Sequence, residues 1–233
     1  MNRINEVFLR KKKNILNIYF TAGYPNIKDT LRIARALQAA GTDIIEIGIP
    51  YSDPIADGPT IQDSSQKALN AGMSLKLLMM QLQDLRKHIS IPVILMGYIN
   101  PVLQYGFVEF CQDCKEVGID GVILPDLPLQ EYMEMYQRTF EEYGLYNIFL
   151  ITPQTSHRRI LRINEVSKGF IYMVSSASIT GAKQGVSQEQ VDYFERIQSM
   201  SLSVERLIGF GISNKETFNA VCKYASGAII GSA

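Results

Sequence analysis

The amino-acid sequence predicts an α/β barrel, in which eight parallel strands form a closed ring inside a layer of helices. Short runs rich in β-branched and aliphatic residues alternate with longer stretches of helical periodicity, and eight such runs occur. Several runs are continuously apolar, as parallel strands buried on both faces should be. The length of 233 residues suits one barrel, since α/β barrels reach about 250 residues. We therefore expect residues 1–233 to form a single TIM-barrel domain.

Each predicted strand precedes a polar turn and a helical stretch. The strands are Ile15–Thr21, Ile44–Ile49, Val93–Gly97, Gly121–Leu124, Asn147–Thr152, Phe170–Val174, Arg206–Gly209 and Gly227–Ile230. The clearest helical stretches are Ile27–Ala40, Ser74–His88, Leu129–Tyr143 and Gln188–Met200, with an additional helix around Gln62–Asn70. Capping side chains and terminal glycines support these boundaries. They are Asp29, Ser74 and Ser187 at helix starts, and Gly41, Gly118 and Gly144 at helix ends.

An open doubly wound sheet is the alternative fold. It usually has fewer strands, and its glycine-rich fingerprint is missing because Thr21–Pro25 contains one glycine. The chain stops at Gly231–Ala233, directly after the eighth predicted strand. A complete barrel covers that strand with a final helix, so we expect the given sequence to lack the last helix.

The charge balance argues against a nucleic-acid binder. Basic and acidic residues each number 23, so the formal net charge is zero. One cationic run, Arg10–Lys13, could contact acidic partners, but a solvated helix end is the simpler interpretation. No apolar run approaches the roughly 18 residues of a membrane helix, and the N-terminus lacks an apolar signal core. We expect a cytoplasmic protein, or a plastid stromal one if the gene is plastid-encoded.

The three cysteines, an odd and small number, argue against a disulfide framework. Cys111 and Cys114 form a CxxC pattern, which can signal redox chemistry or zinc, but they lie in a helical stretch with no second CxxC. With only two histidines, His88 and His157, a histidine-rich metal cluster is not expected. We interpret the cysteine pair as helix packing and predict no metal site.

Glu46 is the lone charged residue in the second predicted strand, Ile44–Ile49. An ionised carboxylate inside a barrel is unfavourable by several kcal/mol unless it is paired, neutralised or used in function. Burial raises the pKa of a carboxyl group and makes it a general acid–base near neutral pH. The alternative is a structural ion pair with a lysine or arginine from another strand.

Asp57 lies in the loop after the same strand, on the carboxyl-terminal face of a barrel, where active sites are built. Pro54 and Pro59 stiffen this loop on both sides. The pair Asp57–Gly58 alone would suit an ordinary turn. Two carboxylates at one barrel mouth can divide proton-transfer work, so we predict that Glu46 and Asp57 are the catalytic residues.

Glycine-containing loops follow the last three predicted strands, at Thr180–Ala182, Gly209–Ser213 and Gly231–Ala233. Glycine lets backbone N–H groups approach an anion, and barrels commonly hold phosphate after strands seven and eight. Ordinary turn glycines explain each loop alone but the set less well, so we expect a phosphorylated ligand. The long polar segment Ser175–Ser187 is either a substrate lid or a passive connection.

The run Glu46–Gln62, EIGIPYSDPIADGPTIQ, closely resembles the signature of tryptophan synthase α chains. Further matches occur in family order and span nearly the whole chain. They are Tyr19–Pro25, Met96–Pro101, Leu124–Pro128, Tyr172 with Thr180–Gly181, Gly209–Ser213 and Gly231–Ser232. The resemblance implies a TIM-barrel lyase of tryptophan biosynthesis. Its reaction would be the retro-aldol cleavage of indole-3-glycerol phosphate to indole and glyceraldehyde 3-phosphate.

The resemblance also implies a role for each matching residue. Glu46 would shuttle protons between the glycerol hydroxyl and indole C3. Asp57 would hold the indole N–H and stabilise positive charge on the ring. Tyr172 would lie beside them, and Tyr19 and Met96 would line the indole pocket. The substrate and its phosphate would be bound around Thr180, Gly181, Phe210, Gly211, Gly231 and Ser232.

A partner follows from the resemblance as well. Family members dock on a β subunit in an α2β2 heterotetramer and pass indole to it through a tunnel. The matching contact positions are Asp53, Asn100 and Pro128. No lysine here has a cofactor-binding context, so pyridoxal phosphate is expected in the partner and no cofactor in this chain.

The chain departs from the family pattern at Ser176, where many relatives have an arginine in a mobile loop. Three alternatives for the function stay open. The chain could be the same lyase without a β partner, a non-catalytic barrel that activates a β subunit, or a different phosphosugar barrel enzyme such as an isomerase.

Overall fold

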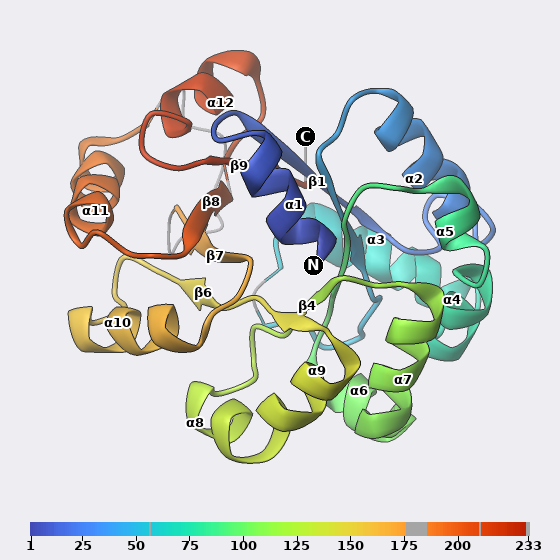
Figure 1. The fold of residues 1–233 in the computed structure, drawn as a ribbon. Coiled ribbons are helices and arrows are strands. Elements are labelled where there is room, and N and C mark those ends of the chain that lie inside the picture. Colours follow the sequence, from blue (N-terminus) through green and yellow to red (C-terminus); the bar gives the residue numbers. More distant parts are fainter. Residues whose placement is uncertain (56, 176–185, 210, 232–233) are drawn as a thin grey trace.

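The strands pair in parallel and curl into a ring, with the helices around its outside (Figure 1). The computed structural model describes residues 1–55, 57–175, 186–209 and 211–231. The strands are β1 (Ile15–Thr21), β2 (Ile44–Gly48), β3 (Val93–Met96), β4 (Gly121–Ile123), β5 (Tyr146–Asn147), β6 (Leu150–Ile151), β7 (Phe170–Val174), β8 (Glu205–Gly209) and β9 (Gly227–Ile230). Their order in the sheet is β5-β4-β3-β2-β1-β9-β8-β7-β6. This is the predicted α/β barrel.

The predicted fifth strand, Asn147–Thr152, is interrupted. Its first part, β5, pairs with β4, and its second part, β6, pairs with β7. Between them, the Ile148 amide donates to the Val122 carbonyl at 2.9 Å, and the Tyr172 amide donates to the Phe149 carbonyl at 2.9 Å. The segment thus changes neighbours within two residues, and the ring closes through it with eight strand positions.

The helices are α1 (Arg3–Arg10), α2 (Thr30–Ala39), α3 (Pro59–Asn70), α4 (Leu75–Gln81), α5 (Leu85–His88), α6 (Ile99–Tyr105), α7 (Phe107–Val117), α8 (Leu129–Glu131), α9 (Gln137–Tyr143), α10 (His157–Val166), α11 (Gln188–Ser199) and α12 (Lys215–Val221). A π-helical turn at Tyr132–Tyr136 joins α8 to α9. Across the described ranges, none of the helices is both long and apolar enough to cross a membrane.

Some helix ends follow the prediction and others do not. Ser74 and Ser187 cap α4 and α11 with their hydroxyl groups, as predicted. Asp29 makes no cap bond, because its carboxylate accepts from the Asn26 amide at 2.8 Å instead. The prediction of a single helix over Ser74–His88 is wrong. A tight turn, in which the Leu85 amide donates to the Leu82 carbonyl, separates α4 from α5.

The core has two layers because successive strand residues point to opposite faces of the sheet. One set of strand residues fills the barrel interior, namely Ile15, Ile44, Ile94, Ile123, Phe170, Leu207 and Ile229. Their sequence neighbours pack outward against the helices, namely Ile45, Val93, Val122, Ile171, Ile208 and Ala228. Burial on both faces explains why the strands read as continuous apolar runs.

Helix α1, which precedes β1, closes one end of the barrel. In Figure 1 it lies in front of the ring of strands. Its buried residues Ile4, Val7 and Phe8 belong to the interior cluster, and the rings of Phe8 and Phe170 are 6.1 Å apart between centroids. Arg10 is the last residue of α1 and is exposed. The cationic run therefore begins at a solvated helix end, as interpreted from the sequence.

Asp120, buried just before β4, fixes this end of the molecule. Its carboxylate accepts from the guanidinium groups of Arg86 at 2.5 Å and Arg3 at 2.9 Å, and from the Val93 amide at 2.8 Å. Arg86 also donates to three backbone carbonyls around the α5–β3 and α7–β4 connections. One carboxylate thus ties α1, α5 and the start of two strands together.

Replacing Asp120 by alanine is expected to destabilise the fold by about 3–5 kcal/mol, because it leaves a largely buried guanidinium without its counter-ion. The measurement is the midpoint of urea unfolding, compared with the native chain. Asp63→Ala removes the partner of an exposed ion pair with Lys67 and serves as the control. Equal effects of the two substitutions would contradict this account of Asp120.

Candidate active site

Glu46 lies inside the barrel, on the same face of β2 as Ile44 and Gly48. Its side chain is completely buried. The Asn17 amide nitrogen on β1 donates to Oε1 of Glu46 at 2.5 Å, and Oε2 has no hydrogen-bond partner among the described residues. No lysine or arginine of the described ranges forms an ion pair with it. The structural ion pair considered from the sequence therefore has no support.

Burial raises the pKa of the Glu46 carboxyl group to about 8, and the hydrogen bond from Asn17 opposes the shift. Burial disfavours the charged form, whereas a donor to the carboxylate favours it. Glu46 is thus mainly protonated at neutral pH and able to lose its proton near that pH. Such a group suits general acid–base chemistry.

Two tyrosines lie over glycines next to Glu46. A methyl group added at Gly48 would lie 2.0 Å from the Tyr19 hydroxyl oxygen, and one at Gly209 would lie 2.2 Å from that of Tyr172. Each phenol therefore occupies the space that a side chain on the adjacent strand would fill. Burial is the main cause that raises the pKa of both phenols, and the negative charges of Asp57 and Glu46 raise both further, whereas a hydrogen bond with Thr21 opposes the shift of Tyr19. Both phenols stay protonated beside the carboxyl group.

The remaining predicted pocket residue, Met96, pairs in register with Gly48 on β2. It is partly buried and packs against the interior cluster. The structure thus brings together Tyr19, Met96 and Tyr172 around the strand that carries Glu46. Aromatic and thioether side chains of this kind commonly line pockets for flat aromatic ligands.

Asp57 is held by Tyr98, which follows β3. The Tyr98 hydroxyl donates to Oδ2 of Asp57 at 3.2 Å and accepts from the Ile55 amide at 3.1 Å. The Gln62 side chain on α3 donates to the backbone carbonyl of Asp57 at 2.7 Å. Burial raises the pKa of the Asp57 carboxyl group, and donation from Tyr98 opposes this. Asp57 also contributes to the raised pKa of Tyr19 and of Tyr172, so it belongs to the same site as Glu46.

The predicted phosphate loops are only partly described. Gly211 follows β8 with φ of +75° and is exposed, and Gly231 follows β9 and is also exposed. A methyl group at Gly231 would lie 3.4 Å from Tyr19, so this loop adjoins the pocket. Four predicted binding residues lie outside the described residues, namely Thr180, Gly181, Phe210 and Ser232. So does Ser176.

The three predicted partner contacts, Asp53, Asn100 and Pro128, are all exposed. They lie on the segments after β2, β3 and β4, at the end of the barrel that carries Asp57. Ile55, between Asp53 and Asp57, is an aliphatic side chain with 80% exposure. This end of the barrel therefore combines the buried Glu46 and the partly buried Asp57 with exposed side chains.

The cysteines lie away from the site. Cys111, Cys114 and Cys222 are free and buried. Burial raises the pKa of the Cys111 thiol to about 12, so it does not ionise near neutral pH. Cys111 and Cys114 pack into the core from α7, which confirms their interpretation as packing residues. Within the described ranges, no group of three or more potential ligands could hold a metal ion.

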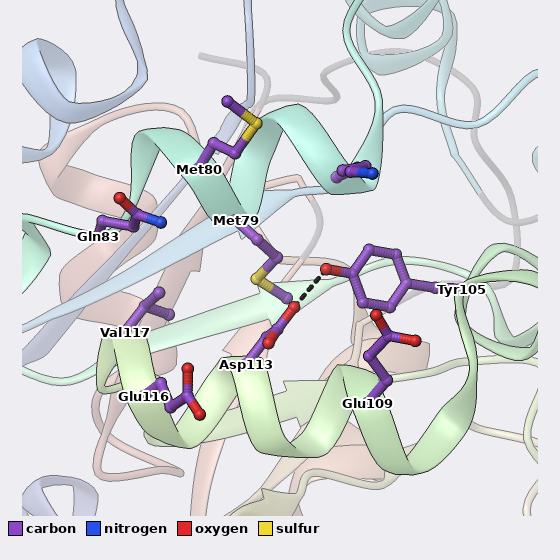
Figure 2. A pocket seen from close by; sticks show the side chains of 9 residues that line it. Met79, Met80, Gln83, Tyr105, Glu109, Asp113, Glu116 and Val117 are labelled. Atoms are coloured by element: carbon purple, nitrogen blue, oxygen red, sulfur yellow. Dashed lines mark hydrogen bonds between the residues drawn. The ribbon is translucent and has the colours of Figure 1, made fainter.

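A groove of about 450 Å³ lies outside the barrel, between α4 and α7 (Figure 2). Met79 and Met80 line it from α4, and Tyr105 donates a hydrogen bond to Asp113 across one end. None of the predicted site residues lines this groove. It is separate from the carboxyl groups in the barrel.

Sequence reasoning missed two functional candidates, Asn17 and Tyr98. Asn17 is a polar residue in the middle of the largely apolar strand β1, which is the signal that singles out Glu46 in β2. Tyr98 lies within the segment Met96–Pro101, but its hydrogen bond to Asp57 depends on a contact between loops of different strands. Only Asn17 could have been found from the pattern of residues.

Comparison with known proteins agrees with this geometry. The family model described as tryptophan synthase alpha chain matches residues 6–233. The chain belongs to the tryptophan synthase alpha chain family. It is 58% identical to the tryptophan synthase alpha chain of Flavobacterium psychrophilum, over 100% of this chain and 92% of that protein. The alpha chain activity, cleavage of indole-3-glycerol phosphate in tryptophan biosynthesis, makes it a lyase.

Solved structures of alpha chains share the fold. The alpha chain from Legionella pneumophila is 34% identical with a TM-score of 0.88, over 100% of this chain and 86% of that one. A chain of Mycobacterium tuberculosis tryptophan synthase is 32% identical with a TM-score of 0.90, over 99% of this chain and 89% of that one. These tryptophan synthase alpha chains need no cofactor of their own, and pyridoxal phosphate belongs to the beta subunit.

Substituting phenylalanine for Tyr98 is expected to lower kcat/KM for indole release by roughly 10- to 100-fold, because a hydrogen bond to a charged group contributes about 1.5–3 kcal/mol. Loss of the donor raises the pKa of Asp57 further, so the acid limb of the pH profile moves to higher pH. Steady-state kinetics across pH provide the measurement.

Tyr51→Phe is the matched control for Tyr98→Phe. Its ring packs against Tyr98 at 5.0 Å between centroids, and its hydroxyl accepts a long 3.5 Å hydrogen bond from Asn100. An unchanged acid limb in Tyr98→Phe would show that Tyr98 does not hold the Asp57 carboxylate.

Proposed function

We propose that Glu46 and Asp57 carry out the lyase reaction of this alpha chain, with Glu46 moving protons and Asp57 holding the indole nitrogen. The observation that supports this most strongly is the state of Glu46. It is fully buried and has one oxygen without a partner among the described residues, and burial raises its pKa to about 8. A buried carboxyl group in that state can both give and take a proton at neutral pH.

The reaction then divides into two proton transfers. Protonated Glu46 first delivers its proton to indole C3, which places positive charge on the ring nitrogen. The Asp57 carboxylate stabilises that charge through the indole N–H. The Glu46 carboxylate next removes the proton of the adjacent glycerol hydroxyl. The electrons of that O–H bond form the aldehyde, those of the breaking carbon–carbon bond return to the ring, and Glu46 ends protonated.

The pocket residues would place the substrate for these steps. Tyr19, Met96 and Tyr172 would contact the indole ring, since they lie around the strand of Glu46. Gly211 and Gly231 would present backbone to the phosphate group. The same role is proposed for Thr180, Gly181, Phe210 and Ser232 from the family pattern alone.

We also propose that Asp53, Asn100 and Pro128 contact a β subunit that receives the indole, in an α2β2 assembly. Their common exposure at the carboxyl-terminal end of the barrel supports this. The similarity to a chain of M. tuberculosis tryptophan synthase implies a beta partner. Bacterial relatives such as that of F. psychrophilum favour the bacterial cytoplasm over a plastid as the location.

Glu46→Gln is expected to reduce indole release by at least about 100-fold, because the amide cannot shuttle a proton. Binding of glyceraldehyde 3-phosphate should survive, since we propose that the phosphate group binds at the loops after β8 and β9, away from the barrel interior. The measurements are indole release and calorimetric titration with glyceraldehyde 3-phosphate. Glu165→Gln, an exposed glutamate on α10, is the control. Near-normal indole release by Glu46→Gln would refute the acid–base assignment.

Asp53→Lys is expected to weaken binding to a tryptophan synthase β subunit by about 10- to 100-fold, as loss of a contact residue at an interface does. Binding is measured by titration, and the stimulation of indole release by the β subunit is recorded in parallel. Glu165→Lys on the exposed face of α10 controls for the charge change. If the β subunit hardly alters the turnover of the native chain, the chain is a free-standing lyase instead.

A further inference from the structure

Asn17 is a polar residue in the middle of the barrel interior. It lies on β1 between Ile15 and Tyr19 on the same face, and its register partners are Ile44 on β2 and Ile229 on β9. Its side chain is completely buried. A buried amide in an apolar cluster is destabilising unless its donors and acceptors are used.

The amide of Asn17 is only partly used. Its nitrogen donates to Oε1 of Glu46 at 2.5 Å, whereas its own oxygen has no hydrogen-bond partner among the described residues. An aliphatic side chain would fill the same space and remove this unpaired oxygen, but it would leave Oε1 of Glu46 unpaired instead. The hydrogen bond of Asn17 is therefore the feature that explains the residue, and it is directed at the carboxyl group that we assign to proton transfer.

Building on the proposed role of Glu46, we propose that Asn17 is a positioning residue that confines the shuttled proton to Oε2 of Glu46. An oxygen that accepts from an N–H group is occupied by that donor and is disfavoured as the protonation site. The proton of the carboxylic acid then resides on Oε2, the oxygen that no described residue engages. In the carboxylate form the same bond holds Oε1, so Oε2 faces the substrate in both states.

The other groups around Glu46 do not replace this donor. Tyr19 faces it from β1, Tyr172 faces it from β7, and Asp57 carries a negative charge on the loop after β2. Burial raises the pKa of the Glu46 carboxyl group, and the hydrogen bond from Asn17 lowers it. Removal of the amide should therefore change both the geometry and the titration of the carboxyl group.

The test is Asn17→Leu, which keeps the approximate size and removes both hydrogen-bonding atoms. We expect a melting temperature close to that of the native chain, because the substitution removes one unpaired buried acceptor, Oδ1 of Asn17, and leaves another, Oε1 of Glu46. We expect kcat for indole release to fall roughly 10- to 100-fold with KM nearly unchanged. The limb on which activity is lost as Glu46 ionises should move to higher pH, since a donor that favours the carboxylate is gone. Infrared titration of the Glu46 carboxyl group should show the same upward shift without relying on turnover.

Asn147→Leu is the matched control. Asn147 on β5 is also a buried strand asparagine whose side-chain oxygen has no partner among the described residues. It should not alter the pH profile. Asn17→Val repeats the test with a smaller side chain suited to strands, in case the leucine variant does not fold.

The outcomes separate this inference from the proposed function. If Asn17→Leu and Asn17→Val keep the native kcat and pH profile while Glu46→Gln is inactive, Asn17 has no positioning role. A loss of activity accompanied by a lower melting temperature and an unshifted profile would also overturn the inference, as it would mark a purely structural role. If Glu46→Gln stays active, the proposed function fails first.

Discussion

The carboxyl group of Glu46 is buried in the barrel without a cation beside it in the part of the chain that the structure describes. Its ionised form is unfavourable there, so the folded protein holds the proton up to about pH 8. The unfolded chain releases that proton near the ordinary value of 4.5. Between these two values, rising pH therefore makes this group increasingly destabilising to the fold. The rest of the barrel must compensate for a site residue that works against stability at neutral pH.

The two ends of the barrel have different roles, since one stabilises the interior around Glu46 and the other carries the loops of the candidate site. At the amino-terminal end, α1 fills the interior with Ile4, Val7 and Phe8, and Asp120 ties the helix to the strands. These apolar side chains thus close the amino-terminal end of the barrel interior, below the carboxyl group. At the other end the loops carry Asp57 and the exposed residues Asp53, Asn100 and Pro128. Because α1 closes the amino-terminal end, we expect a substrate of Glu46 to enter from the end where Asp57 lies.

Much of this fold can be predicted from the sequence, because strands buried on both faces leave continuous apolar runs that polar turns separate. The interruption between β5 and β6 cannot, since it depends on where the ring closes and not on local residues. The division between α4 and α5 is missed for a related reason, as apolar periodicity continues through Leu82 and Leu85.

The candidate site likewise has residues that the sequence pattern reveals and contacts that it does not. A charged residue in a strand reveals Glu46, and the same pattern could reveal Asn17. The hydrogen bond between Tyr98 and Asp57 joins residues 41 positions apart. It depends on how the loops fold together, so it cannot be predicted from sequence spacing. Buried and loop carboxylates predict a proton donor and acceptor, but their spacing does not identify the substrate. The substrate is identified by the resemblance to the tryptophan synthase alpha chain family.

The tyrosines and glycines of the pocket have a consequence for how such a site can change over generations. Tyr19 occupies the space above Gly48, and Tyr172 occupies the space above Gly209, each pair on adjoining strands. A larger residue at either glycine is tolerated only after its tyrosine has become smaller. We therefore expect each tyrosine and its glycine to change together during evolution. A single substitution at either glycine that would alter the size of substrate the pocket accepts would first clash with the tyrosine.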